Sequence, residues 1–153
     1  MSTLRSVKNS RVCFGCGPEN AAGLQLEFEM LDGGAKLRTR FAPRAIHGGW
    51  EGVFHGGLMA TLLDEAMMAY LYRSGIHAAT AELTVRFRKP VRLGEELVVE
   101  AWSEERRGRM IRTVAEARRD GELVARANAS CLEIAEGAEA DADDAAQQEG
   151  EVS

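Results

Sequence analysis

The sequence predicts an α+β domain in which an antiparallel β-sheet wraps around one long central helix. In residues 58–72 the only charged side chains are Asp64 and Glu65, and apolar residues occupy every side of the expected helix. A helix of this kind needs cover on all sides. The runs before and after it alternate apolar and polar residues, which is the period of strands with one buried face. A sheet curled around the helix satisfies both patterns.

Two alternating runs before the helix predict a β-hairpin. Residues 24–30 and 35–41 each alternate apolar with polar side chains, and the Asp-Gly-Gly sequence at 32–34 is a suitable turn between them. Residues 42–54 show no period and are rich in glycine, so they predict a loop that leads into the helix.

The expected start of the helix combines two glycines with a free first turn. Gly56 and Gly57 follow His55 and leave backbone N–H groups uncovered. The first turn of a helix has N–H donors without intrahelical partners and carries the positive end of the dipole. Such an end can bind a developing oxyanion. Gly75 is expected to end the helix as a C-terminal glycine.

Alternating patterns after the helix predict more strands over residues 80–88, 97–101, 109–118 and 122–134. An Asp-Gly turn at 120–121 joins the last two of them. One face of the last strand carries small side chains, which lets a helix lie close: Ala125, Ala127, Ala129 and Cys131.

Length and composition predict one domain with a single core, at residues 1–135, followed by an acidic tail at 136–153. The tail holds seven acids and no base, and we expect it to be disordered. Without it, 17 acids face 19 bases, so the net charge of -5 becomes +2. A mildly basic body suits an anionic small molecule and does not suit nucleic acid.

Neither a signal peptide nor a membrane span is expected from the apolar runs of the sequence. Its 3 cysteines, an odd number, indicate reduced thiols and a cytoplasmic protein. The sequence has no GxGxxG, Walker or Gly-x-Ser-x-Gly motif, which disfavours nucleotide-driven and serine-hydrolase chemistry.

The spacing of Cys13 and Cys16 suits a zinc knuckle, but such a site needs two further ligands. The rest of the chain offers only Cys131 and scattered histidines, without a second pair. We therefore expect no metal, and interpret this stretch as a turn-rich lead-in whose thiols and Phe14 pack against the sheet.

Three segments together resemble the hotdog-fold acyl-CoA thioesterases of the PaaI-like branch, in the superfamily of 4-hydroxybenzoyl-CoA thioesterase. They are CFGCGPENAAGL at 13–24, HGGLMATLLDEAM at 55–67 and TAELTVRFRKPVRLGEELVVEA at 80–101. The resemblance implies a hotdog fold and hydrolysis of acyl-CoA or a related acyl-pantetheine carrier. It implies no metal or redox cofactor, and it implies that two protomers pair their sheets edge to edge with the reaction at their interface.

The resemblance also implies roles for single residues. Asp64 would act as general base or nucleophile, the Gly57 N–H would donate to the oxyanion, and Thr80 would help to hold the attacking water. His55 matches the histidine of the His-Gly-Gly motif, and Gly56 beside it would contact the substrate.

One position departs from the branch, whose members commonly have an asparagine six residues before that histidine. Here the position is Gly49. The polar contact is therefore absent, or His47, Trp50 or Glu51 supplies it.

The spacing along the helix predicts a partner chain. Gly57 and Asp64 lie roughly 10 Å apart along the axis, so one carbonyl cannot contact both on the same helix. The base would then come from a second, antiparallel copy, in a dimer or a dimer of dimers.

Alternatives remain open for several of these residues. Glu65 is either the working acid or a substrate contact, and Asp64 could be a buried carboxylate bonded to Thr61 or to a backbone donor. Four cations suit the phosphates of a CoA-like carrier, although a solvated strand edge has the same pattern: Arg86, Arg88, Lys89 and Arg92. The alternative functions are a non-catalytic acyl-CoA binding module and a hotdog-type acyl dehydratase.

Overall fold

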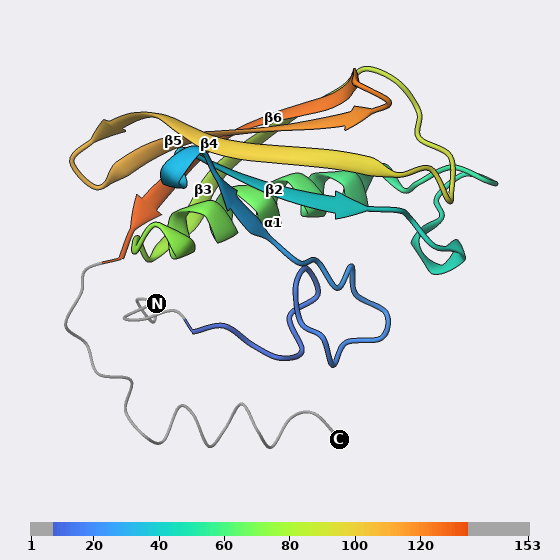
Figure 1. The fold of residues 1–153 in the computed structure, drawn as a ribbon, viewed down its shortest axis with the longest axis horizontal. Coiled ribbons are helices and arrows are strands. Elements are labelled where there is room, and N and C mark those ends of the chain that lie inside the picture. The colour runs from blue at the N-terminus through green and yellow to red at the C-terminus, as the bar shows by residue number, and fades with distance from the viewer. Residues whose placement is uncertain (1–7, 135–153) are drawn as a thin grey trace.

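The computed structural model of the chain describes residues 8–134, and the predicted acidic tail at 136–153 lies outside them. One sheet of six antiparallel strands, in the order β1-β2-β4-β5-β6-β3, packs one face against a single long helix (Figure 1). The predicted hotdog arrangement is therefore confirmed. The elements are β1 (Glu29–Leu31), η1 (Asp32–Gly34), β2 (Lys36–Phe41), η2 (Ala45–His47), α1 (Gly56–Arg73), β3 (Ala78–Phe87), β4 (Leu97–Arg107), β5 (Met110–Arg119) and β6 (Glu122–Glu133).

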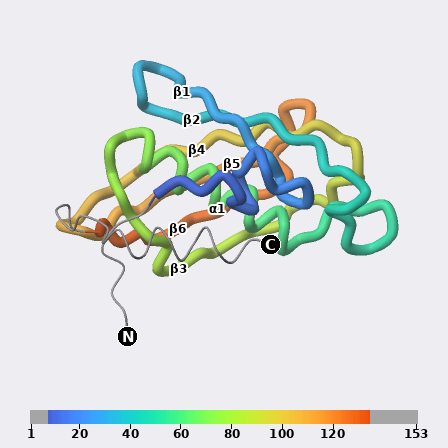
Figure 2. Tube along the Cα trace, turned by 90° about the horizontal axis from the view of Figure 1, so that it is seen from below, coloured from blue at the N-terminus to red at the C-terminus, as the bar shows by residue number. Residues whose placement is uncertain are grey.

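Helix α1 begins and ends where the sequence predicts. His55 is the N-cap, Ser74 is the C-cap, and Gly75 follows with a φ of 81° that favours glycine. None of residues 58–71 is exposed, so the expected cover on all sides is present. The sheet covers one side of α1, and the segment that begins at Lys8 crosses the other side (Figure 2).

The small face of β6 does let the helix lie close to the sheet. Ala125, Ala127 and Ala129 are all buried in the same cluster as Leu62 and Met67 of α1. Burial of such leucine and methionine side chains contributes about 1.5–3 kcal/mol each. The core therefore fixes the position of the helix above β6.

Residues 24–30 form less strand than predicted, because β1 begins only at Glu29. Leu24 and Leu26 are buried as the alternation requires. Their backbone N–H groups, however, donate to the carbonyl oxygens of Phe14 and Gly15, at 2.8 and 3.0 Å. A loop, and not a neighbouring strand, is the partner of this stretch, so the pattern of burial was right and the assignment to a strand was wrong.

The two edges of the sheet differ in length. At one edge lies β1, with 3 residues, and at the other lies β3, with 10 residues. Leu83 and Val85 of β3 are only partly buried, and the side chain of Phe87 is 55% exposed. A long edge strand with apolar side chains is a template for pairing with another chain.

Within residues 8–134, α1 and the shorter helical turns lack the length and apolarity needed to cross a membrane.

Candidate active site

Asp64 lies in the middle of α1 and points toward the start of β3. The Thr80 hydroxyl donates to Asp64 Oδ1 at 2.7 Å, beside a bulge in β3. Burial raises the pKa of the Asp64 carboxyl above its ordinary value, and the hydrogen bond from Thr80 opposes part of that rise. A carboxylate with a raised pKa is a stronger base toward water.

The buried thiol of Cys131 lies on the sheet side of the Asp64 site, which the sequence did not reveal. Burial raises the pKa of the Cys131 thiol, and the Asp64 charge raises it further. Cys131 Sγ lies 3.6 Å from the Thr113 hydroxyl, which donates to Met67 Sδ at 3.2 Å. These buried neutral groups explain why Asp64 is poorly solvated on the sheet side.

Thr61 is not the partner of Asp64. Its hydroxyl donates to the Gly57 carbonyl oxygen at 3.0 Å, within the same helix. The alternative in which Asp64 is a carboxylate bonded to Thr61 is therefore wrong, and the Asp64 carboxylate bonds to the neighbouring strand.

At the start of α1 one of the expected N–H donors is already engaged. His55 Nδ1 accepts from the Gly57 N–H at 2.9 Å, and the Leu58 N–H donates to the His55 carbonyl at 3.0 Å. Among residues 8–134 the Gly56 N–H has no such partner. The Phe87 ring lies beside Gly56, about 3.7 Å from where a Cβ would stand. The open donor at this end is that of Gly56, whereas Gly57 is held by the His55 ring.

Gly49 packs directly against His55. A Cβ at Gly49 would lie 3.1 Å from His55 Cα and 3.3 Å from Cδ2, which is a tight contact. His47 is fully buried and accepts from the Arg44 N–H, and its other ring nitrogen lies 3.3 Å from the Ala22 carbonyl. His47 is therefore occupied, and of the three candidates for the missing polar contact only Trp50 and Glu51 are exposed.

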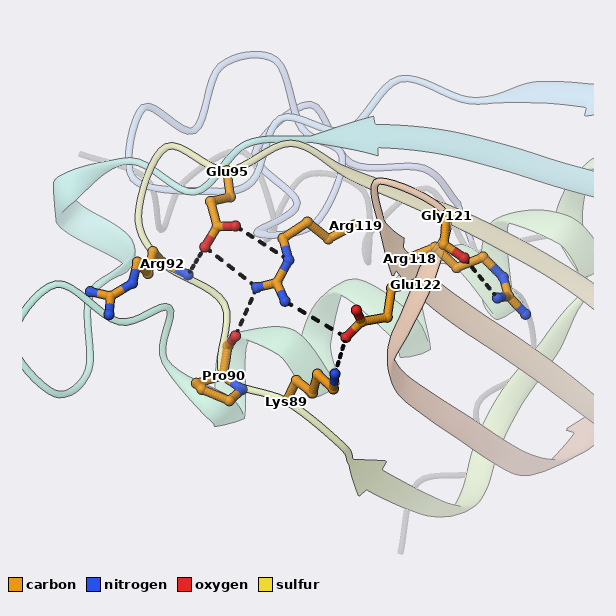
Figure 3. Close-up of polar contacts among 8 residues, drawn as sticks. All are labelled: Lys89, Pro90, Arg92, Glu95, Arg118, Arg119, Gly121 and Glu122. Carbon is orange, nitrogen blue, oxygen red and sulfur yellow. Dashed lines mark hydrogen bonds and ion pairs between the residues drawn. The ribbon is translucent and has the colours of Figure 1, made fainter.

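The four predicted cations have different surroundings, and Figure 3 shows two of them, Lys89 and Arg92. Lys89 forms an ion pair of 2.5 Å with Glu122, which also contacts Arg119. Arg92 uses only its backbone N–H in this network, and its side chain points away from it (Figure 3). Within the described part of the chain, the guanidinium groups of Arg88 and Arg92 form no ion pair.

Arg86 lies elsewhere. It alternates along β3 with Val85 and Phe87, which belong to the side that faces α1 and its start. The Arg86 side chain therefore extends from the opposite face of the sheet. Arg88 and Arg92 follow the end of β3 that lies at the helix start, because the Val53 bridge to Arg92 holds the two segments together.

Glu65 points away from Asp64 and toward the lead-in segment. The Cys13 thiol lies 3.6 Å from Glu65 Oε1, and Cys16 completes a cluster of three side chains. Burial, together with the hydrogen bond and charge of Glu65, raises the pKa of the Cys16 thiol. Phe14 between them is 42% exposed, so the expectation that it packs against the sheet is wrong, because the lead-in lies across the helix.

A cavity of about 280 Å³ borders this cluster. Cys16 and Glu65 form part of its wall, Lys8 and Arg73 add charge, and Met68 follows Asp64 by one helical turn. Apart from Asn9, the remaining lining is mostly apolar: Leu26, Phe28, Ala69, Tyr72, Ile76 and Ala78.

Comparison with known proteins identifies the domain. The family described as the thioesterase superfamily matches residues 51–125, which include the start of α1, Asp64 and Thr80. The chain belongs to the thioesterase superfamily. None of the curated proteins matches it significantly in sequence.

Solved structures of superfamily members agree with the fold. One thioesterase superfamily protein has a TM-score of 0.75 and 28% identity over 80% of this chain, which spans 60% of that protein's length. A phenylacetic acid degradation-related protein from Ralstonia eutropha has a TM-score of 0.65 and 26% identity, covering 71% of this chain and 85% of its own.

A hypothetical thioesterase from Streptococcus pneumoniae, solved with coenzyme A, has a TM-score of 0.66 and 16% identity, covering 71% of this chain and 87% of its own. At that identity the likeness concerns the fold.

Proposed function

We propose that this thioesterase superfamily chain hydrolyses acyl-CoA or related acyl-pantetheine thioesters. The observation that carries the proposal is Asp64, a half-buried carboxylate with a raised pKa, bonded to Thr80 and open to one side of α1. The structural neighbour from Streptococcus pneumoniae holds coenzyme A, which supports a CoA-type substrate. Thioesters are suited to such a site because thiolate is a good leaving group.

In the proposed reaction Asp64 accepts a proton from a water molecule as the water oxygen attacks the thioester carbon. The carbonyl oxygen becomes an oxyanion and accepts a hydrogen bond from an N–H at the positive end of a helix. The tetrahedral intermediate then releases the thiolate, which takes up the proton that Asp64 had accepted. Thr80 holds Asp64 in position, so that the free oxygen of the carboxylate faces the water.

The donor in this proposal is the Gly56 N–H, because His55 Nδ1 already accepts from the Gly57 N–H. Use of the Gly57 donor would first require the His55 ring to move. His55 thus acts as a cap that fixes the start of the helix, and this role favours a thioesterase over a dehydratase that would need a free histidine.

The two halves of the site require two chains. Gly56 and Asp64 lie about 12 Å apart along one helix. Phe87, at one end of β3, contacts Gly56, while Thr80, near the other end, contacts Asp64. Antiparallel pairing of two β3 edges would bring Asp64 of one chain toward Gly56 of the partner subunit. We propose a homodimer, or a dimer of dimers, with two such sites per pair.

The phosphates of the carrier are proposed to contact Arg88 and Arg92, which extend from the chain next to the helix start. Both guanidinium groups are free of carboxylate partners within residues 8–134. Lys89 is a weaker candidate, because its amine is paired with Glu122.

The experiment that tests the proposal is a panel of acyl-CoAs incubated with the purified protein, with release of free CoA followed by a thiol reagent. We expect the wild-type protein to hydrolyse at least one acyl-CoA. The Asp64→Asn variant should not hydrolyse that substrate. Binding of several acyl-CoAs by calorimetry without release of thiol would contradict hydrolysis. It would assign the chain to acyl-CoA binding alone.

A further inference from the structure

A cluster of two thiols and one carboxylate lies on the side of α1 that faces away from the sheet. Cys13 and Cys16 come from the lead-in segment and Glu65 comes from the helix. One ligand atom from each lies within 4.8 Å of the other two. The proposed thioester hydrolysis uses none of these groups.

We propose that Cys13, Cys16 and Glu65 bind one zinc ion per chain. Zinc prefers thiolate, imidazole and carboxylate ligands in a tetrahedral arrangement. The sequence alone argued against a metal because no second pair of cysteines or histidines is present. The fold supplies a third ligand that spacing could not reveal, since Glu65 comes 49 positions after Cys16 in the sequence.

The separations within the cluster are compatible with a tetrahedral ion. Zinc bonds of about 2.3 Å to sulfur and about 2.1 Å to oxygen place the two ligand atoms roughly 3.6 Å apart at the tetrahedral angle. Cys13 Sγ and Glu65 Oε1 are 3.6 Å apart. The same bond lengths require about 3.8 Å between two sulfurs, which lies inside the 4.8 Å limit of this cluster.

The loop that carries the two cysteines is built around the carboxylate. A Cβ at Gly15 would lie 2.4 Å from Glu65 Cδ, so only glycine lets the carboxylate reach the thiols. Gly17 N–H donates to the Cys13 carbonyl at 2.9 Å and closes the turn. The bond from Leu26 N–H to the Gly15 carbonyl, at 3.0 Å, fixes the loop to the next segment.

Binding would exchange two thiol protons for the ion. Both thiols must lose their protons to coordinate zinc, and these protons pass to solvent. Two thiolates and one carboxylate with Zn²⁺ leave a net charge of −1, and Lys8 and Arg73 line the adjoining cavity. Cys16 and Glu65 both border that cavity, so the fourth position would face it and take a water molecule.

Zinc would fasten the lead-in segment to the helix next to the proposed base. A ligand that binds only the folded chain raises its stability by mass action. The ion would also hold the Glu65 carboxylate against the lead-in, about 100° around the helix axis from Asp64. The role assigned to this site is therefore the positioning of the lead-in, and not attack on the substrate.

The test is metal binding by the full chain, purified under reducing conditions and treated with a chelator. Zinc is titrated by calorimetry, and cobalt(II) is added separately as a spectroscopic probe. We expect one equivalent of zinc per chain and the absorption bands of tetrahedral cobalt with thiolate charge transfer. Absence of saturable zinc binding would overturn the proposal, as would octahedral cobalt spectra without a thiolate band.

Variants assign the ligands. Cys13→Ser, Cys16→Ser and Glu65→Gln are each expected to weaken zinc binding by at least about tenfold. Each serine variant keeps one thiolate ligand, so its cobalt charge-transfer band should fall to about half of the wild-type intensity. Cys131→Ala, which removes the buried thiol outside the cluster, is the matched control and should bind one equivalent. Circular dichroism checks the fold of each variant. The site would be contradicted if the three ligand variants and Cys131→Ala all bound zinc with equal affinity. It would also be contradicted if, under reducing conditions, Cys13 and Cys16 formed a disulfide that excludes zinc.

Discussion

Asp64 and Glu65 are neighbours in the sequence, yet they lie in two different regions of the molecule. Asp64 turns toward β3 and meets Thr80, with the buried Cys131 behind it. Glu65 turns toward the lead-in and meets two thiols. The rotation of about 100° per residue along a helix separates the two carboxylates. The chemical role of each carboxylate thus depends on the element that it faces from the helix.

The largest expected effect is on kcat, and it distinguishes the Asp64 region from the Glu65 region. Asp64→Asn removes the base with little change in shape, and loss of a general base typically costs on the order of 10² to 10⁴ in rate. We predict that kcat on a good acyl-CoA substrate falls by that factor while the fold persists. Steady-state kinetics with circular dichroism measure both.

Glu65→Gln is the matched comparison, one residue along the same helix. It should lower kcat far less, by under about tenfold, because Glu65 contacts no reacting atom. If Glu65→Gln abolished turnover and Asp64→Asn retained it, the two assignments would be exchanged.

The hydrogen bond from Thr80 should control the pH dependence of the Asp64 region. Burial raises the pKa of Asp64 above 3.8 and the Thr80 hydroxyl lowers it in part. The acidic limb of the kcat profile should therefore lie above pH 3.8 in the wild type. Thr80→Val removes the hydroxyl and should move that limb to higher pH. An unchanged limb would show that Asp64 is not the titrating base.

The cations beyond β3 should affect substrate binding and not the chemical step. Hydrogen bonds to charged groups contribute about 1.5–3 kcal/mol, so Arg88→Ala or Arg92→Ala should raise KM for acyl-CoA on the order of tenfold. Lys89→Ala should have less effect, because Lys89 is paired with Glu122. Acyl-pantetheine substrates lack the CoA nucleotide phosphates, and their KM should not change. An equal rise for both substrates would disprove phosphate contact.

The smallest effect concerns stability. Burial raises the pKa of Asp64 in the folded chain above that in the unfolded chain. The contribution of Asp64 to the free energy of unfolding is therefore fully present below the ordinary aspartate pKa, and it is lost as the pH rises through the pKa of the folded state. At neutral pH, Asp64→Asn should therefore stabilise the chain. Thermal unfolding of both proteins should show this gain at pH 7 and its decline toward acidic pH. A destabilised variant at pH 7 would mean that the charged carboxylate is well compensated.

The sequence predicted the fold and the Asp64 region better than the Glu65 region, for physical reasons. Periodicity determined α1 and most strands, since burial of one face dictates the pattern. It misassigned residues 24–28, because a loop can satisfy the same backbone groups as a strand. The resemblance to the family named Asp64 and Thr80 as site residues, whereas the hydrogen bond between them is visible only in the structure.

The details that escaped prediction depend on side-chain contacts between distant segments. The cluster of Cys13, Cys16 and Glu65 joins a loop to a helix, and although the spacing of the two cysteines is visible in the sequence, nothing there places Glu65 beside them. Likewise, the engagement of the Gly57 N–H depends on the orientation of the His55 ring, which the motif does not specify.

The most direct test of the central claim is the activity of a mixed dimer. One chain carries Asp64→Asn and the other carries Gly56→Pro, which replaces the N–H by a ring carbon at the first position of the helix, where proline is tolerated. His55 has φ −62° and ψ 127°, a conformation compatible with a following proline.

Each variant homodimer should lose on the order of 10² or more in kcat. Two differently tagged chains, co-expressed and purified through both tags, should form a dimer with one intact site and about half the wild-type kcat. If the mixed dimer stays as inactive as its parents, Asp64 and Gly56 act within one chain or not at all, and the shared site is contradicted.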